Sequence, residues 1–289
     1  MILNSELILN SDGTIFHLHL KPENIADQII LVGDQARVDT VAGFFEKTDF
    51  SVKNREFRTV TGWYNGKKIS VISTGIGTDN IDIVMNELDA LVNIDLEKRE
   101  IKTEKKSLNL VRIGTSGSLQ EDLPVNSFLM TQKSIGFDGM LNFYANRELI
   151  CDLPFEKAFK QFTNWNEFLP TLYVVDASRK LQNKFDSPEF KKGVTISAPG
   201  FYGPQGRVLR LPLAMPQLNK LLEQFRFEDY KITTFEMESS AIYGLSKMLG
   251  HQALTICLVI ANRVTKQANE NYRPVMEQLI KKVLDILTK

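Results

Sequence analysis

The stretch Gln28-Ile29-Ile30-Leu31-Val32-Gly33-Asp34 decides the fold class of this chain. Its apolar run ends in Gly-Asp and is followed by a helical pattern over residues 36–46, which predicts a strand, a turn and a helix. Apolar runs over 108–113 and 254–261 repeat the strand pattern. Strands that are apolar along their whole length are typical of sheets covered by helices on both faces. We therefore expect an α/β fold.

Asn65-Gly66 predicts that this sheet also contains an antiparallel pair. The two residues separate the expected strands 59–64 and 68–74, and Asn-Gly supplies the two positive φ angles of a tight hairpin turn. The sheet is therefore mixed, within one domain over residues 1–289. Other strands are expected over 108–113, 127–133, 194–198 and 254–261, and other helices over 80–92, 176–184, 217–225 and 273–287. The densely charged segment 95–107 is expected to be a solvated excursion between elements.

Composition excludes several classes of protein. The chain has 289 residues, of which 43% are hydrophobic and 24% are charged, as in a globular protein with a large core. Its 35 basic and 35 acidic residues balance, so charge gives no argument for a nucleic acid or membrane partner. No signal peptide or transmembrane run is recognisable, and we expect a cytoplasmic protein. Cys151 and Cys257 lie far apart without nearby metal ligands, so reduced thiols and no metal site are expected.

Glycine-rich turns with polar side chains are expected where three strands end, and ligands of such sheets bind beyond the carboxyl ends of the strands. These turns hold Gly33, Asp34 and Arg37; Gly75 and Gly77; and Arg112, Gly114, Thr115, Ser116 and Gly117. Free backbone N–H groups, a hydroxyl and two guanidiniums make an oxyanion site of the size of phosphate. Because dinucleotide and P-loop signatures are both absent, a small free anion is favoured over a nucleotide.

Each of these residues also has a plain structural explanation. Arg112 lies in an apolar strand and needs either an anion or an internal acidic partner, because an unpaired buried guanidinium is costly. Gly75 and Gly77 are equally suited to tight packing of the chain after a strand. Arg37, in a first helical turn, is also typical of a surface residue. The sequence leaves these alternatives open.

Glu236-Met237-Glu238 is expected at a strand-to-helix junction, where both carboxylates can point into one cleft. Two acceptors beside a flexible thioether suit a sugar, since carboxylates hold hydroxyls and Met packs on the ring. Acidic residues that open a helix to complement its dipole are the alternative.

The turn-rich loop 201–207 carries Phe201, Gln205 and Arg207. An aromatic ring to stack on, an amide that both donates and accepts, and a guanidinium together suit a pyrimidine-like base. Taken alone, the loop is more typical of an ordinary surface segment.

In their order and spacing these residues resemble the nucleoside phosphorylase-I family, and within it the uridine phosphorylases. The resemblance extends from about residue 16 to residue 267, and its marks are Phe16-His17-Leu18, Gly33-Asp34 with Arg37, Arg55-Glu56-Phe57, Ser73-Thr74-Gly75-Ile76-Gly77, Arg112-Ile113-Gly114-Thr115, the loop 201–207, Glu236-Met237-Glu238-Ser239 and Ile260-Ala261-Asn262-Arg263. It implies a single domain with a mixed central sheet, partly barrel-like and flanked by helices.

The resemblance also implies a role for each site residue. Phosphate is bound by Gly33, Arg37, Arg112 and Thr115, with Arg55 from a neighbouring subunit. Ribose is bound by Glu236, Met237 and Glu238, with His17 of the neighbour at the 5′-hydroxyl. The base is bound by Phe201, Gln205, Arg207 and Arg263. Among these, the catalytic residues are Arg37, Arg112, Arg207 and Glu238.

The implied reaction is reversible phosphorolysis of uridine to uracil and ribose 1-phosphate, without a metal or a cofactor beyond the co-substrate phosphate. A monovalent cation near Glu56, as in some relatives, and a homo-oligomer built from dimers, either a dimer or a hexamer, are further implications. Hexameric purine phosphorylases carry an Asp where Asn262 stands, which favours a pyrimidine here. The loop Gly203-Pro204-Gln205-Gly206-Arg207 departs from the usual Pro-Gly-Gln-Glu-Arg. A purine phosphorylase, a nucleosidase and a catalytically silent nucleoside-binding protein therefore stay open, as does activity on deoxyuridine or thymidine.

Overall fold

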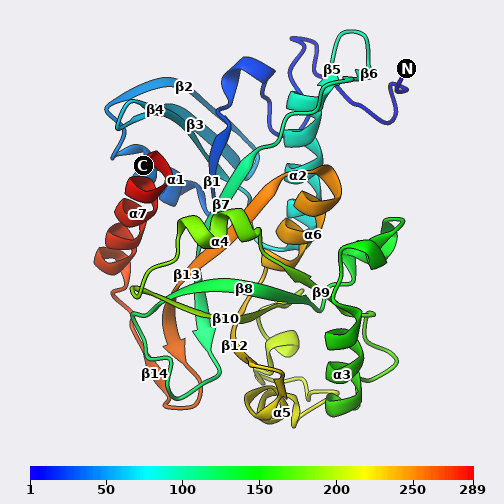
Figure 1. Ribbon diagram of the computed structural model, residues 1–289, viewed down its shortest axis with the longest axis vertical. Coiled ribbons are helices and arrows are strands. Elements are labelled where there is room, and N and C mark those ends of the chain that lie inside the picture. Colours follow the sequence, from blue (N-terminus) through cyan, green and yellow to red (C-terminus); the bar gives the residue numbers. More distant parts are fainter.

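A twelve-stranded mixed sheet forms the centre of the molecule (Figure 1), and the computed structural model describes all residues, 1–289. The order of the strands is β11-β12-β10-β8-β13-β7-β1-β4-β3-β2, with β14 paired to β13 and β9 to β8; β5 and β6 form a separate pair. The fold is a single α/β domain in which helices flank the sheet, as the sequence predicts.

The strands of the central sheet are β1 (Gln28–Val32), β2 (Lys47–Asn54), β3 (Phe57–Tyr64), β4 (Lys67–Ser73), β7 (Asn109–Ser118), β8 (Phe128–Gly136), β9 (Tyr173–Asp176), β10 (Phe190–Ser197), β11 (Arg226–Phe227), β12 (Tyr230–Glu236), β13 (Gln252–Asn262) and β14 (Gln267–Ala268). The α-helices are α1 (Gln35–Ala42), α2 (Thr78–Asn93), α3 (Leu153–Thr163), α4 (Arg179–Lys184), α5 (Leu218–Gln224), α6 (Ser239–Leu249) and α7 (Arg273–Thr288). Short 3₁₀ turns are η1 (Pro22–Asn24), η2 (Met140–Phe143), η3 (Arg147–Leu149) and η4 (Gly203–Gln205).

Four parallel strands, β4, β1, β7 and β13, carry the turns that the sequence singles out. In β1, Leu31 lies between Ile72 of β4 and Arg112 of β7. Helices α1 and α7 lie on one side of these strands and α2 and α6 on the other (Figure 1). Because both faces are covered, four of the five residues of β1 are buried, which explains its uninterrupted apolar sequence.

The hairpin expected at Asn65-Gly66 is confirmed. Strands β3 and β4 pair antiparallel around it, and the two turn residues have φ angles of 49° and 69°. Among the other antiparallel contacts, one joins β12 to β7 through Thr234 and Phe235. It turns the sheet back on itself, but it consists of two residue pairs and does not make a closed barrel.

Strand β7 is longer than expected. The expectation of a turn at Gly114-Thr115-Ser116-Gly117 is wrong, because β7 continues through these residues to Ser118 while pairing with β13. A side chain at position 114 would overlap the guanidinium of Arg112, which lies along the strand over Gly114. Glycine here makes room for a neighbouring side chain rather than for a turn.

Helix α1 is shorter than expected, ending at Ala42 before Gly43 instead of continuing to residue 46. The chain then enters β2, an edge strand whose residues are exposed or half-buried. The charged excursion leaves the body as the two-stranded pair β5 (Ile94–Asp95) and β6 (Glu100–Ile101), and residues 100–107 are all exposed. Both cysteines are free thiols, and none of the helices has the length and apolar character to cross a membrane.

Candidate active site

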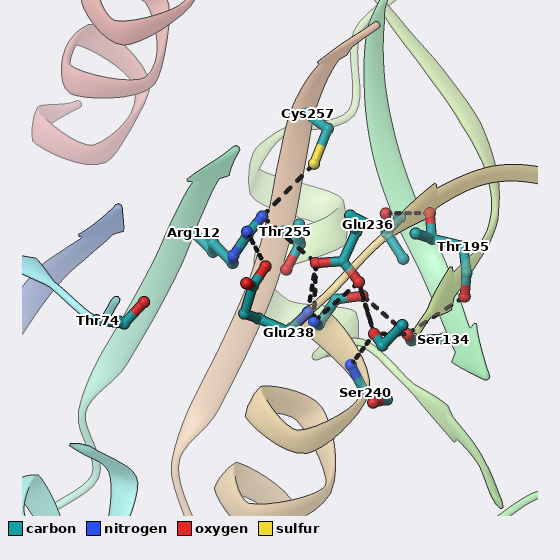
Figure 2. A network of polar contacts seen from close by, with 12 residues as sticks. Thr74, Arg112, Ser134, Thr195, Glu236, Glu238, Ser240, Thr255 and Cys257 are labelled. Atoms are coloured by element: carbon teal, nitrogen blue, oxygen red, sulfur yellow. Dashed lines mark hydrogen bonds and ion pairs between the residues drawn. The ribbon is translucent and has the colours of Figure 1, made fainter. Parts of the chain in front are cut away.

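Arg112 lies at the centre of a buried ionic cluster (Figure 2). Its Nη2 donates to Glu238 Oε2, and its Nη1 lies 3.4 Å from Glu236 Oε2 and 3.7 Å from Cys257 Sγ. Strand β12 ends at Glu236 and α6 begins after Glu238, so the strand-to-helix junction aims both carboxylates at one guanidinium. Arg112 therefore has the internal acidic partner that was one of its two alternatives.

Glu236 is held rigidly by the protein itself. Its carboxylate accepts from the hydroxyls of Ser197 at 2.5 Å and Ser239 at 2.7 Å. It also accepts from the backbone N–H groups of Glu238 at 2.9 Å and Ser239 at 3.0 Å. The Ser239 hydroxyl lies 2.8 Å from that of Ser134 on β8. Charge-assisted bonds of this kind fix a buried carboxylate in one orientation.

Glu238 has fewer partners and is more available to a ligand. Apart from Arg112, it accepts only from the backbone N–H of Gly77, at 2.9 Å, where α2 begins. Gly77 has a φ of 99°, a conformation that suits glycine and aims this N–H at the carboxylate. Met237, between the two glutamates, is half-buried.

Two carboxylates share one guanidinium, so the cluster carries one excess negative charge. Burial alone would lower the pKa of Arg112, but Glu238 and Glu236 together raise it above its usual value. Burial raises the pKa of Glu238, and although Arg112 opposes this, Glu236 adds to the rise. Burial also raises the pKa of Cys257 to about 12, which keeps it a neutral thiol. The cluster is suited to accept hydrogen bonds from hydroxyl groups.

The glycine turns after β1 and β4 lie beside each other near this cluster. Thr74 N–H donates to Val32 O at 2.8 Å, and a Cβ at Gly33 would lie 3.9 Å from the Gly75 carbonyl oxygen. Thr115, half-buried on β7, makes no side-chain hydrogen bond within the chain, so its hydroxyl is free for a ligand.

The other two arginines expected at phosphate are held separately. Arg37 Nη2 lies 3.1 Å from Asp34 Oδ2 at the start of α1, where Asp34 also caps the helix. Arg55 lies in the exposed turn between β2 and β3, and its guanidinium carbon lies 5.5 Å from the centre of the Phe16 ring. Of these three arginines, only Arg112 contacts Glu236 and Glu238 of the same chain.

His17 lies close to Arg55. The carbonyl of His17 accepts from Asn54 Nδ2 at 2.8 Å, and its ring packs edge-on against Phe16, at 4.8 Å between centroids. Arg55 follows Asn54 in the chain and contacts the same Phe16 ring. The structure thus brings together the two residues that the resemblance assigns to a neighbouring subunit's site.

The residues expected at the base form a second cluster. Gln205, on η4, is buried, and its Oε1 accepts from Arg207 Nη1 at 2.6 Å and from Arg263 Nη2 at 3.1 Å. The guanidinium of Arg207 also stacks on Phe201, 3.7 Å from the ring centre. Burial and the charge of Arg207 lower the pKa of Arg263 to about 10. No residue of the chain accepts from the side-chain Nε2 of Gln205, so this cluster offers donors to carbonyl oxygens.

Two contacts place the base cluster next to the carboxylate cluster. Arg263 lies over the ring of Phe235, 5.0 Å from its centre, and Phe235 directly precedes Glu236. Ser197, which binds Glu236, ends β10, and the loop with Phe201 and Gln205 follows. Glu236 and the loop with Gln205 therefore lie at the carboxyl ends of the neighbouring parallel strands β12 and β10, where ligands of such sheets bind.

Asn262, beside the base cluster, uses its whole side-chain amide in hydrogen bonds to backbone groups. Its Nδ2 donates to the carbonyls of Gln120 and Leu123 at 2.9 and 3.0 Å. Its Oδ1 accepts from the N–H groups of Val264 and Thr265 at 2.9 and 3.0 Å. It shapes the turn after β13 and has no group left for a ligand.

Three residues that support this site are not among those predicted from the sequence. Ser197, Ser239 and Glu87 are absent from the expected set, although Ser239 is part of the Glu-Met-Glu-Ser motif and could have been found there. Glu87 has no local signal, because its partner His17 is seventy residues away in sequence. No group of three or more His, Cys, Asp or Glu side chains is arranged to hold a metal ion.

Comparisons with known proteins identify the family of the chain. The family model described as the phosphorylase superfamily matches residues 27–289. A Trypanosoma brucei nucleoside phosphorylase, whose crystal structure shows uridine phosphorylase activity, superposes with a TM-score of 0.89 at 31% identity, over 98% of this chain and 99% of that one. A uridine phosphorylase of Thermococcus kodakarensis is 27% identical over 92% of this chain and 83% of its own length. A DeoD-type purine nucleoside phosphorylase of Oceanobacillus iheyensis is 26% identical over 94% of this chain and 99% of its own length.

Proposed function

This chain belongs to the phosphorylase superfamily, and we propose that it phosphorolyses uridine to uracil and ribose 1-phosphate. The chain is a pentosyltransferase of the nucleoside phosphorylase type. The choice of uridine rests on the base cluster, where Gln205, Arg207 and Arg263 present hydrogen-bond donors beside the carboxylates. Two carbonyl oxygens and an N–H at the edge of uracil match two guanidiniums and an amide.

Asn262 further supports a pyrimidine over a purine. A purine leaving group needs a proton on its imidazole nitrogen, which a carboxylic acid supplies. All four hydrogen bonds of the Asn262 amide are made to backbone groups, and an amide is not an acid. A uracil anion instead needs donors for the charge that develops on its oxygens, and the base cluster provides them.

In the proposed reaction a phosphate oxygen bonds to C1′ while the bond from C1′ to the base nitrogen breaks. The bonding electrons leave with the base, where Arg207, Arg263 and Gln205 stabilise the negative charge. Glu238 accepts hydrogen bonds from ribose hydroxyls, and its negative charge favours the oxocarbenium-like sugar of the transition state. No covalent enzyme intermediate is needed.

Phosphate is proposed to bind at Gly33, Arg37, Arg112 and Thr115. Entry of the dianion beside Arg112 gives the guanidinium a new partner, and ribose hydroxyls then replace Arg112 as donors to Glu238. Holding phosphate and sugar side by side supplies the positioning on which a displacement of this kind depends.

A second copy of the chain is proposed to complete each site with Arg55 and His17. The two residues lie together, at the exposed β2–β3 turn and in the N-terminal segment, and neither forms an ion pair with Glu236 or Glu238 of its own chain. The assembly is predicted to be a dimer or a hexamer. A monovalent cation near Glu56 and a cytoplasmic location also stay predictions.

An assay with a panel of nucleosides tests this function. The protein is incubated with uridine, deoxyuridine, thymidine, inosine and adenosine, each with and without phosphate, and free base and pentose 1-phosphate are measured. We expect uracil and ribose 1-phosphate in equal amounts, and only with phosphate. Turnover of inosine or adenosine alone would establish the purine alternative, which the similarity to DeoD-type enzymes keeps open. Release without phosphate would indicate a nucleosidase, and no turnover a binding protein.

A further inference from the structure

The N-terminal segment is fastened to α2 through one carboxylate, Glu87. Its Oε1 lies 2.6 Å from Nδ1 of His17 and 3.0 Å from the backbone nitrogen of the same residue. Its Oε2 accepts from the backbone N–H of Leu18 at 2.8 Å. One side chain thus fixes both the backbone and the ring of His17, and it is itself only 12% exposed.

This contact decides which nitrogen of His17 faces outward. An ionised carboxylate only accepts hydrogen bonds, so the proton of a neutral imidazole must lie on Nδ1. Nε2 has no hydrogen-bond partner in the chain, and the side chain of His17 is 27% exposed. The ring therefore offers Nε2 as an acceptor to a molecule outside the chain.

We propose that Glu87 is a positioning residue for nucleoside binding: it holds His17 as the Nδ1–H tautomer, so that Nε2 accepts from the 5′-hydroxyl of a nucleoside in a neighbouring copy's site. This inference rests on the proposed function, in which His17 serves the neighbour. Carboxylates orient histidines in the same way behind metal ions, where their loss weakens binding although they never touch the ligand.

Helix α2 makes this arrangement rigid. Gly77, before its first residue, donates to Glu238 of the chain's own site, and Glu87 lies farther along the same helix. The apolar face between them is buried through Ile81, Val84 and Met85. Through Glu87, the packed helix α2 therefore fixes the position of His17.

The first experiment measures the tautomer directly and does not depend on activity. With only three histidines in the chain, imidazole ¹⁵N NMR can assign His17 by its loss in His17→Ala. At roughly pH 8.5, about two units above the usual histidine pKa, we expect a protonated Nδ1 and a bare Nε2 in the wild type. Glu87→Ala should move the proton to Nε2, whereas an Nε2–H tautomer in the wild type would overturn the proposal.

Asp12→Asn provides a matched control for the same spectra. Asp12 Oδ2 lies 3.1 Å from Nε2 of His19, so this variant removes another carboxylate from another histidine of the same segment. We expect it to leave the His17 signals unchanged. Glu87→Gln keeps an acceptor for the backbone N–H groups and provides a second variant if Glu87→Ala does not fold.

The second experiment compares uridine with 5′-deoxyuridine, which lacks the hydroxyl. The measured quantity is the ratio of kcat/KM for uridine to kcat/KM for 5′-deoxyuridine. We expect this ratio to fall about tenfold in Glu87→Ala and in His17→Ala, because a factor of ten corresponds to about one hydrogen bond. The double variant should lose no more than either single one, and Asp12→Asn should keep the wild-type preference. Equal losses on both substrates would show a merely structural role and overturn the proposal. Absence of uridine turnover in the wild type would instead refute the proposed function, and the tautomer would still be measurable.

Discussion

At the scale of single residues, Arg112 keeps two buried carboxylates compatible with folding. Removing one partner from a buried ionic cluster leaves uncompensated charge, which typically costs about 3–5 kcal/mol. We expect Arg112→Ala to lower the free energy of unfolding by about this amount at neutral pH, as measured by urea denaturation. The double variant Arg112→Ala with Glu238→Gln should recover part of the loss. Equal stability of wild type and Arg112→Ala would contradict the cluster described here.

Gly114 should matter through Arg112 rather than through the backbone. A methyl group at this position would overlap the guanidinium. We expect Gly114→Ala to reduce kcat/KM about a hundredfold, as small misplacements of positioning groups do. Gly117→Ala, in the same strand, is the matched control, since its methyl group would meet Arg263 Nε at an ordinary 3.8 Å. If both variants had the same activity, the position of Arg112 would not depend on Gly114.

Glu238 should give the enzyme an acid limit. Burial and Glu236 raise its pKa, so it becomes protonated at a higher pH than an ordinary glutamate. A protonated carboxyl accepts fewer hydroxyl protons, and kcat/KM for the nucleoside should fall as pH falls through this raised pKa. The effect on stability has the opposite sign: a raised pKa contributes stability below the ordinary value, and this is lost as pH rises. Both pH dependences should be absent from Glu238→Gln, as rate and urea profiles against pH would show.

At the scale of elements, the sequence predicted the helices and strands whose formation depends on neighbouring residues alone. The apolar run of β1 and the Asn65-Gly66 hairpin were found because burial and turn geometry leave their mark in the sequence itself. Strand β2 was missed because, as a partly exposed edge strand, it lacks a continuous apolar run. Helix α3 was missed although Asp152 caps it and Pro154 follows in its first turn, signals that could have revealed it.

Strand β7 shows where local signals fail. Gly114-Thr115-Ser116-Gly117 has the composition of a turn, but pairing with β13 and the space required by Arg112 keep it extended. For the candidate site, the sequence similarly identified side chains suited to phosphate, sugar and base. It could not foresee that Arg112 is paired with Glu238 while Arg37 is paired with Asp34, because those contacts depend on tertiary structure.

The charged excursion has a role that its composition conceals. Arg99 donates to the carbonyls of Ile2, Leu3 and Leu7, and its own carbonyl accepts from Ile2 N–H. Arg99→Ala removes these three side-chain hydrogen bonds, and we expect it to speed amide hydrogen exchange in residues 1–9 by at least roughly tenfold, the effect of losing even one of them. Lys98→Ala, in the same hairpin but paired only with Asp95, should leave that exchange unchanged. Unaltered exchange in Arg99→Ala would mean that other contacts hold the segment.

At the scale of the whole molecule, each site is expected to need two chains. The double variant His17→Ala with Arg55→Ala removes the residues that a chain contributes to its neighbour's site. Glu238→Gln instead alters a residue of the chain's own site. When the two impaired proteins are mixed by joint refolding, half of random pairs are mixed and each mixed pair has one intact site, so activity should rise to about a quarter of the wild-type value. A mixture no more active than its components would mean that each site is built from one chain.

The most direct measurement is a crystal structure with phosphate and an uncleavable uridine analogue bound. We expect the phosphate between Gly33 and Arg112, the ribose hydroxyls on Glu238, and the uracil oxygens facing Gln205 and Arg207. An anion bound elsewhere, with Arg112 still closed on both glutamates and the sugar outside the cluster, would contradict the proposed site and the reaction derived from it.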